Sequence, residues 1–562
     1  MMATLLHDQR LANALIGSAL VTFTLLLHVI FPNTGASGQT LPFNGAMWMG
    51  FFLMVALALW PVTHGKVQFS AFHLGVALLL LAFWLPLFWS WNEASLVALP
   101  RLLGVTAGAL LLFALAQPGL SRRHWWWLGM AILAGALLET ALGYVQLYVL
   151  ERTDPLSYLL GYDPLSGRPF GVFQHVNVMA SFLASALVIS AWLQGEARNR
   201  LEKAVILLAP LFMPVLILVI QSRTSWFAVL IAVPLVLIHL YKLDQARCRE
   251  WGAALLVGCM LAAIAWWAPW AEESVAVKAV DKAGERLPVY LHSLRMILEA
   301  PFSGWGYGRF QHDFVHSFAD WRAALPVNQP VVVDPLITAT FFHPHNELLL
   351  WGVEGGLLPM LAMIGFGSWV IWRIWSHGPR GERLLMTVLP LPLVLHAMTE
   401  FPFYYSLGHW LAFLLILGMI ADRCWPTREK TMGSGAPLRV GIIFAVPLLW
   451  GFMMTHLHAL WQIKLVIDRQ GRDISSLERI VNPLGIGYEI DYLQMNYDLH
   501  RKSPQAYREY KLWWLEASGK YPDRGLYENM LVLQRMHNDR NPVLSYEEAA
   551  RLYPLIPAWL GR

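Results

Sequence analysis

The chain has 562 residues, of which 57% are hydrophobic and only 14% are charged, whereas a soluble globular protein carries about 25% charged residues. The formal net charge of +4 at pH 7 is too small to indicate a nucleic-acid partner. The three cysteines, Cys248, Cys259 and Cys424, lie in or beside apolar segments, which argues against a disulfide framework or a zinc cluster.

Apolar segments of roughly 20 residues recur along the chain, and each is long enough to cross about 30 Å of hydrocarbon as a helix. Because a helix satisfies its own backbone polar groups in lipid, we expect an all-α polytopic membrane protein. We predict thirteen spans, at residues 11–31, 44–61, 70–89, 102–117, 125–150, 176–194, 204–220, 225–241, 252–270, 347–371, 385–398, 407–421 and 439–459. The first is longer than the core of a signal peptide, so we interpret it as a retained anchor.

Lysine and arginine are unevenly distributed among the connecting segments. If the N-terminus is cytoplasmic, the short cytoplasmic segments contain sixteen basic residues: Arg10, Lys66, Arg122, Arg123, Arg198, Arg200, Lys203, Lys242, Arg247, Arg249, Arg373, Arg380, Arg383, Arg423, Arg428 and Lys430. The short loops on the other side contain four: Arg101, Arg152, Arg168 and Arg223. This bias predicts the orientation. The polar segment 271–346 then lies outside the cytoplasm. The tail after residue 460 does too, because the number of predicted spans, thirteen, is odd.

Two groups of polar residues fall at span boundaries on the exported side. In "GVFQHVNVMASFLA" (171–184), Gln174, His175 and Asn177 precede or open the sixth span. They could cap that helix, but three hydrogen-bonding side chains in four residues favour substrate contact. In "QSRTSW" (221–226), Arg223 lies in a tight turn between two spans. Snorkelling is one explanation for this charge, and an anion-binding role is the one we favour.

Residues 284–310, "GERLPVYLHSLRMILEAPFSGWGYGRF", contain Arg286 and Tyr290 near their start, and apolar residues follow at helical spacing. This pattern predicts an amphipathic helix on the outer leaflet. The "GWGYG" run superficially resembles a nucleotide-binding glycine loop, but no strand precedes it and no βαβ unit surrounds it. We expect these glycines to shape a turn after Pro301 instead.

The segment "FFHPHNELLLW" (341–351) places His343, His345 and Asn346 immediately before an apolar run. Residues two apart do not share a helix face, Pro344 breaks a helix here, and no acidic cluster is near, so a metal site is disfavoured. A structural histidine is the plain alternative. Acid–base chemistry at the interface is favoured, since the ordinary histidine pKa lies near operating pH.

The segment "HAMTEFPFYYSLGHW" (396–410) places His396 and Glu400 one helical turn apart, followed by Tyr404 and Tyr405. The tyrosines could be ordinary interfacial anchors. A buried glutamate needs a partner, and His396 is the nearest candidate by spacing.

The tail after residue 460 mixes charged and apolar residues at helical spacing, which predicts a small helical domain over 460–562, beside a transmembrane domain over 1–459. Its role is either a solubilising cap or acceptor docking.

With these motifs in order, the sequence resembles the O-antigen ligase/polymerase (Wzy_C) superfamily through "FFHPHNELLLWGVEGG". The pieces "GVFQHVNVMASFLA" and "HAMTEFPFYYS", with the helical tail, are similar to its PglL-type branch, the protein O-oligosaccharyltransferases. The resemblance implies a GT-C-like bacterial inner-membrane transferase that needs no metal or cofactor. Its partners would be a glycan on undecaprenyl pyrophosphate, membrane lipid, and Ser or Thr hydroxyls of a periplasmic or pilin-like protein, with the active site and tail in the periplasm.

By motif position, the resemblance implies that His345 is the essential histidine and that Arg223 and Arg286 contact the diphosphate. It also connects Gln174 and Tyr405 with function, while the extra His175 and His343 leave open which imidazole acts. We add a further set as candidate substrate-binding residues: His175, Asn177, Tyr290, His343, Asn346, Glu400 and Tyr404.

The chemistry of these residue types agrees with such a reaction. Guanidinium groups stabilise the charge that builds on a departing pyrophosphate, and a hydroxyl needs a base to become a good nucleophile. Two alternatives stay open: an O-antigen ligase that transfers glycan to lipid A-core, and a polysaccharide flippase. A flippase would carry polar residues across the bilayer midplane, whereas here they gather on one face.

Overall fold

The computed structural model describes residues 2–35, 38–164, 167–267, 286–324, 337–500 and 504–561. Two parts of the predicted exported segment, 271–285 and 325–336, lie outside this description. The described residues are mostly helical. Their sheet is a short antiparallel pair, β1 (Lys66–Phe69) with β2 (Arg428–Thr431), in which Lys66 is opposite Thr431.

Twelve helices within the described ranges are long and apolar enough to cross a membrane, which confirms an all-α polytopic fold. These crossings are built on α1 (Met2–Thr24), α2 (Pro42–Leu59), α3 (Ala71–Trp84), α5 (Ser95–Leu115), α6 (Arg122–Tyr148), α8 (Val176–Glu196), α9 (Arg200–Ile220), α10 (Arg223–Leu243), α11 (Gln245–Trp267), α17 (Leu357–His377), α21 (Leu407–Cys424) and α22 (Ala436–Asp468). Helix α8 is the most deeply enclosed, since nearly all of its side chains are buried.

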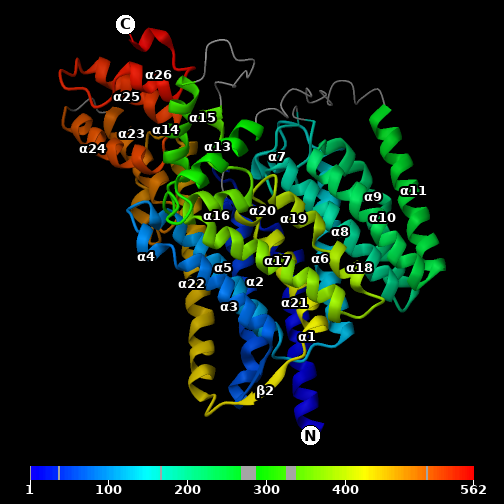
Figure 1. Ribbon diagram of the computed structural model, residues 1–562. Helices are drawn as coiled ribbons and strands as arrows, with labels where there is room; N and C mark the ends of the chain where they lie inside the picture. Colours follow the sequence, from blue (N-terminus) through cyan, green and yellow to red (C-terminus); the bar gives the residue numbers. More distant parts are fainter. Residues whose placement is uncertain are drawn as a thin grey trace.

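The predicted span 385–398 is a pair of short helices, α18 (Arg383–Val388) and α19 (Leu391–Ala397). Pro390 and Pro392 lie at the junction, and proline removes a helical hydrogen bond. The two chain ends lie at opposite ends of the molecule, as Figure 1 shows. This placement fits an odd number of crossings, with α18 and α19 together as the additional one.

The predicted span 347–371 is wrong at its start, because the structure breaks it into α16 (Glu347–Gly355) and α17. The break is Gly356, whose φ of +76° and ψ of −167° belong to a backbone region that is essentially reserved for glycine. A β-carbon at Gly356 would lie 2.8 Å from the carbonyl oxygen of Pro301. Helix α16 is therefore a separate element that follows the histidine motif.

The chain before the histidine motif forms α13 (Arg286–Glu299), α14 (Phe310–Ala323) and α15 (Ile337–Thr340). The predicted turn after Pro301 is confirmed, since Gly304, Gly306 and Gly308 all have positive φ. Backbone N–H groups of this turn bond the end of α16: Trp305 donates to the carbonyl of Val353 (2.8 Å), and Gly306 to that of Glu354 (3.0 Å). The glycine run thus caps α16.

The residues after α22 form α23 (Gly487–His500), α24 (Pro504–Lys520), α25 (Arg524–Met536) and α26 (Tyr546–Leu552), as the helical spacing predicted. Their apolar core includes two residues of α14, the fully buried Val315 and Ala319. Helices α13–α15 and α23–α26 lie together (Figure 1), at what we call the C-terminal end of the molecule. Shorter helices are α4 (Leu87–Ser90), α7 (Pro155–Leu160) and α20 (Pro402–Tyr405).

Candidate active site

The histidine motif folds into a tight turn in front of α16. His345 has a φ of +53°, a conformation that is uncommon for a residue with a side chain. Its backbone N–H donates to Nδ1 of His343 (2.9 Å), and its own Nδ1 lies 2.9 Å from the carbonyl oxygen of His343. A carbonyl oxygen can only accept, so Nδ1 of His345 carries the proton. In the neutral ring, Nε2 therefore presents a lone pair.

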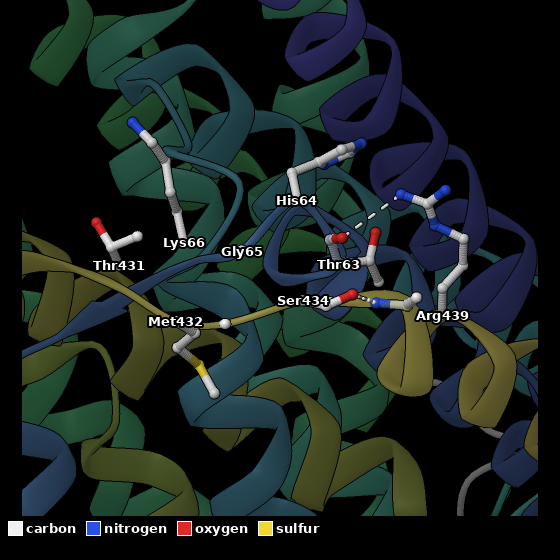
Figure 2. A pocket seen from close by; sticks show the side chains of 11 residues that line it. Thr63, His64, Gly65, Lys66, Thr431, Met432, Ser434 and Arg439 are labelled. Atoms are coloured by element: carbon white, nitrogen blue, oxygen red, sulfur yellow. Dashed lines mark hydrogen bonds between the residues drawn. The ribbon is translucent and has the colours of Figure 1, made fainter.

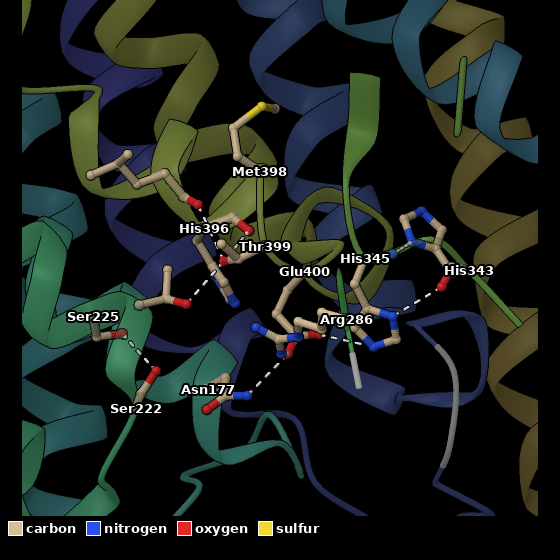
Figure 3. Close-up of polar contacts among 12 residues, drawn as sticks. Asn177, Ser222, Ser225, Arg286, His343, His345, His396, Met398, Thr399 and Glu400 are labelled. Atoms are coloured by element: carbon tan, nitrogen blue, oxygen red, sulfur yellow. Dashed lines mark hydrogen bonds and ion pairs between the residues drawn. The ribbon is translucent and has the colours of Figure 1, made fainter. Parts of the chain in front are cut away.

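Glu400 is the residue on which the candidate site converges (Figure 3). Its Oε1 accepts hydrogen bonds from the guanidinium of Arg286 and from Nδ2 of Asn177, the latter at 3.1 Å. Its Oε2 lies 3.3 Å from Nε2 of His345. Glu400 is buried, and its partners come from the start of α13, the first turn of α8 and the turn before α16. Four separate elements thus place one carboxylate among a cation, an amide and an imidazole.

His396 is not the partner of Glu400, contrary to the prediction from helical spacing. Helix α19 ends at Ala397, so the two side chains do not continue on one helix face. The His396 ring is fully buried, and neither of its nitrogens has a hydrogen-bond partner among the described residues. The two residues are joined only through the backbone, where the N–H of Glu400 donates to the carbonyl of His396 (2.8 Å).

Tyr290 and Asn346 hold the backbone around this centre. The Tyr290 hydroxyl lies 3.1 Å from the carbonyl oxygen of His345 and 3.2 Å from that of Met398. Asn346 caps α16 by accepting from the N–H of Leu349 (3.0 Å), and its Nδ2 donates to the carbonyl of Met398 (3.0 Å). Both side chains tie the histidine turn to the residues just before Glu400, and their predicted contact with substrate stays a prediction.

Arg223 is the first residue of α10, in a tight turn as predicted, and its side chain is exposed. The hydroxyl of the next residue, Thr224, lies 2.9 Å from the hydroxyl of Thr399, which directly precedes Glu400. The start of α10 is thereby fixed beside the site. Arg223 is placed near the centre by this neighbouring contact, whereas Arg286 contacts Glu400 itself.

The loop before α8 carries Gln174 and His175 to the same region. Gln174 has a φ of +53°, and the ring of His175 lies with its centroid 5.1 Å from that of the Tyr405 ring. Two residues of α6, Gln146 and Glu139, hold this loop in place through hydrogen bonds. Gln146 accepts from the N–H groups of Phe170 (3.0 Å) and Gly171 (2.8 Å) and donates to the carbonyl of Gly171 (3.0 Å).

Glu139 is the second residue of α6 that holds this loop, and its side chain is fully buried. Its Oε2 accepts from the N–H of Val172 (3.1 Å), while its Oε1 lies 3.1 Å from Nε2 of His28. The sequence predictions included neither Glu139 nor Gln146. The available signal was a carboxylate inside a predicted span, since an ionisable residue at that depth indicates function or a buried partner.

Tyr404 belongs to a second buried cluster, centred on Arg101 of α5. Arg101 forms an ion pair with Glu354 of α16, and its guanidinium carbon lies 4.4 Å from the ring centroid of Trp351 and 5.9 Å from that of Tyr404. Arg101 was predicted to lie in an exported loop, but its side chain is buried. The ring of His343 lies between the two clusters, with its centroid 5.6 Å from the Tyr404 ring and 6.1 Å from the His345 ring.

Burial sets the charge state of the two histidines of the turn. Removal from water disfavours the charged imidazolium, and burial lowers the pKa of His345 to about 4, with the Arg286 guanidinium contributing. Burial also lowers the pKa of His343 well below its ordinary value. Both rings are therefore neutral at physiological pH, and His345 directs an unprotonated Nε2 at Glu400.

Among the described residues, no three His, Cys, Asp or Glu side chains are placed to hold a metal ion. A cavity of about 370 Å³ lies near β2, at the end opposite α23–α26, between the start of α22 and the turn at Gly65. Its lining includes Lys66 and Arg439 (Figure 2), and it shares no residue with the predicted site.

Three segments of the chain match known protein families. Residues 169–193 match the protein glycosylation ligase family, residues 204–364 match the O-antigen ligase family, and residues 384–555 match the C-terminal part of virulence factor membrane-bound polymerases. A comparison with curated proteins gave no match. The two ligase families point to a glycosyl-transferring enzyme. They confirm the resemblance to the superfamily of O-antigen ligases and PglL-type protein glycosylation ligases.

Proposed function

We propose that the protein transfers an oligosaccharide from undecaprenyl pyrophosphate to Ser or Thr hydroxyls of periplasmic or pilin-like proteins, without a metal ion and with inversion at the anomeric carbon. The observation that carries the proposal is the convergence of Arg286, Asn177 and His345 on the buried Glu400. The family matches support it, because they include both protein glycosylation ligases and O-antigen ligases.

The proton of the acceptor hydroxyl goes to the pair formed by His345 and Glu400. Nε2 of neutral His345 and Oε2 of Glu400 are both acceptors, and 3.3 Å separates them. Two acceptors at this distance repel unless a proton or hydroxyl lies between them. When the acceptor oxygen bonds to the anomeric carbon, the carbon–oxygen bond to the diphosphate breaks, and the hydroxyl proton stays with this pair.

Arg286 and Arg223 stabilise the departing diphosphate. A guanidinium has five N–H donors and can bind Glu400 and a phosphate together. About a third of the Arg286 side chain is exposed, which leaves it accessible to a donor. Arg223 adds a second exposed guanidinium at the start of α10, and a helix N-terminus also favours a negative charge.

Helix α13 keeps the polyprenyl end of the donor at the membrane. Its exposed leucines recur at helical spacing, as in an amphipathic helix that lies on a bilayer, and they are Leu287, Leu291, Leu294 and Leu298. The same helix begins with Arg286. A lipid tail along this leucine face therefore brings the diphosphate to the guanidinium. The bias of the basic residues supports placing the C-terminal end outside the cytoplasm, and the family resemblance supports a bacterial inner membrane with this end in the periplasm.

The decisive experiment gives the purified protein a lipid-linked glycan and a Ser/Thr-containing acceptor protein in detergent. We expect mass spectrometry to find the oligosaccharide on Ser or Thr. Transfer without a sealed bilayer excludes a flippase. Transfer to lipid A-core with none to protein would replace the proposed acceptor by that of an O-antigen ligase, which the match of residues 204–364 also supports.

A further inference from the structure

A cavity of about 270 Å³ lies beside Gln174, and none of the site residues so far assigned to proton transfer or diphosphate binding lines it. Its lining comes from the segment before α2, from α7 and its flanks, from the loop before α8, and from α22: Asn33, Arg152, Tyr158, Tyr162, Gln174 and Lys464 are among its residues. Small-molecule sites usually enclose about 300 to 1,000 Å³. The cavity is therefore suited to a short part of a glycan and not to a whole oligosaccharide.

Gln174 presents its amide to this cavity. No hydrogen bond of its side chain to the described residues is found, although the amide is only partly exposed. Two glycines leave it uncovered, since a methyl group at Gly35 would lie 3.3 Å from its Oε1 and one at Gly161 would lie 3.9 Å from its Nε2. An amide with a free donor and a free acceptor can bind neighbouring hydroxyls of a sugar at the same time.

The loop that carries Gln174 is held in place. Gln146 and Glu139 of α6 together make four hydrogen bonds to the backbone of Phe170, Gly171 and Val172. A β-carbon at Gly171 would lie 1.8 Å from Oε2 of Glu139, so the loop approaches the carboxylate as closely as a glycine permits. Binding at Gln174 therefore requires little additional ordering of this loop.

The charges at the cavity favour a neutral ligand. Nε of Arg152 lies 4.0 Å from Oδ1 of Asp163, and Nζ of Lys464 lies 2.6 Å from Oδ1 of Asp468. Each cation that lines the cavity therefore already faces a carboxylate. The remaining lining combines amides with two tyrosines. The hydroxyl of Tyr158 already donates to Asp468 (2.8 Å), so this residue offers the cavity its apolar ring face. A pyranose ring has the same combination of polar and apolar parts, because its hydroxyls surround an apolar C–H face. A phosphate would have to compete with these carboxylates for Lys464 and Arg152.

Gln174, which lines the cavity, is also close in sequence to residues of the reacting centre. Asn177, three residues after Gln174, donates to Glu400, and His175 packs its ring near Tyr405. We infer that this cavity is a sugar subsite, in which Gln174 and Tyr158 bind uncharged sugar residues of the donor glycan while Arg286 and Arg223 bind its diphosphate. The inference rests on the proposed transfer reaction and adds which part of the donor binds where.

The test is the steady-state kinetics of the purified full-length chain with a lipid-linked glycan and an acceptor peptide. We expect Gln174→Ala to raise the KM for the donor about tenfold, the size expected for one or two lost hydrogen bonds. The KM for the acceptor should change by less than about twofold. Tyr158→Ala is the second variant, because this side chain is 54% exposed and its loss leaves no buried void.

Gln470→Ala is the matched control. Gln470 has the same left-handed backbone, with a φ of +55° against +53° for Gln174, and it does not line the cavity. Any effect of alanine in that conformation is therefore common to both variants. An unchanged donor KM in both Gln174→Ala and Tyr158→Ala would overturn the sugar subsite, and so would a rise confined to the acceptor KM. Absence of transfer by the wild-type chain would instead contradict the proposed function.

Discussion

At the scale of single residues, Glu400 shows how one buried carboxylate organises the site. Its two oxygens contact Arg286, Asn177 and His345, which come from three other elements. A buried carboxylate is costly unless it is paired and hydrogen-bonded, so these contacts also fix the positions of their own elements. The amide and the guanidinium both use Oε1, which leaves Oε2 for the imidazole.

The pH dependence of transfer tests the state of His345. Burial lowers its pKa to about 4 from the ordinary 6.5, and the unprotonated ring is the form that accepts a proton. The rate should therefore fall only as the pH drops through about 4, and it should be flat between about pH 5 and 7. The measurement is kcat/KM over pH 4 to 8. An acidic limb centred near 6.5 would show that the ring is not buried as described.

Individual residues also show what could be predicted from the sequence. His345 and Asn177 were expected at the site because polar residues at the mouths of apolar segments are few, and Arg286 was expected there through the family resemblance. The partner of Glu400 was predicted wrongly, since the end of α19 separates its face from that of His396. The burial of Arg101 was not predictable either, because its partner Glu354 is 253 residues away.

At the scale of elements, the break between α16 and α17 separates the histidine turn from the membrane-spanning helix. A continuous span over 347–371 was the natural expectation from hydropathy. Hydropathy does not detect the backbone conformation of Gly356, nor the carbonyl of Pro301 against which it packs. The turn at Gly304, Gly306 and Gly308 was predictable, since glycines in a short run favour turns.

Replacing Gly356 by alanine tests this break. Alanine would have to adopt a glycine-only conformation with its β-carbon 2.8 Å from the Pro301 carbonyl oxygen, so we expect a loss of about 1–3 kcal/mol and a lower melting temperature. Gly365→Ala is the control, because Gly365 lies within α17 and a β-carbon there would meet nothing within 4 Å. Equal melting temperatures for the two variants would contradict a required break at Gly356.

At the scale of the whole molecule, the C-terminal helices contact the segment that leads into the histidine turn. Val315 and Ala319 of α14 are buried in their core. The hydroxyl of Thr338 donates to the carbonyl of Leu552 (2.6 Å), and Nε2 of Gln311 donates to that of Pro522 (2.9 Å). We therefore propose that residues 460–562 are not a mechanically independent domain, although they follow residues 1–459 in the chain.

Removing residues 504–561 should lower transfer to every acceptor, including a short peptide, because it uncovers the buried face of α14. A module that serves only for docking would leave transfer to a peptide unchanged, and that result would contradict a scaffold role. Leu512→Ser is the control, since Leu512 lies on α24 and is 70% exposed. Exposed substitutions of this kind usually change stability by less than about 0.5 kcal/mol.

The most direct test of the account compares Glu400→Gln with Glu382→Gln in the detergent transfer assay. Glu382 also pairs with arginines, Arg122 and Arg423, but it shares no contact with the site residues. We predict that Glu400→Gln lowers kcat by about 10²- to 10⁴-fold, the range associated with loss of acid–base catalysis, and that Glu382→Gln keeps kcat within about tenfold of wild type. Wild-type turnover by a folded Glu400→Gln variant would contradict the claim that this carboxylate organises the reacting centre.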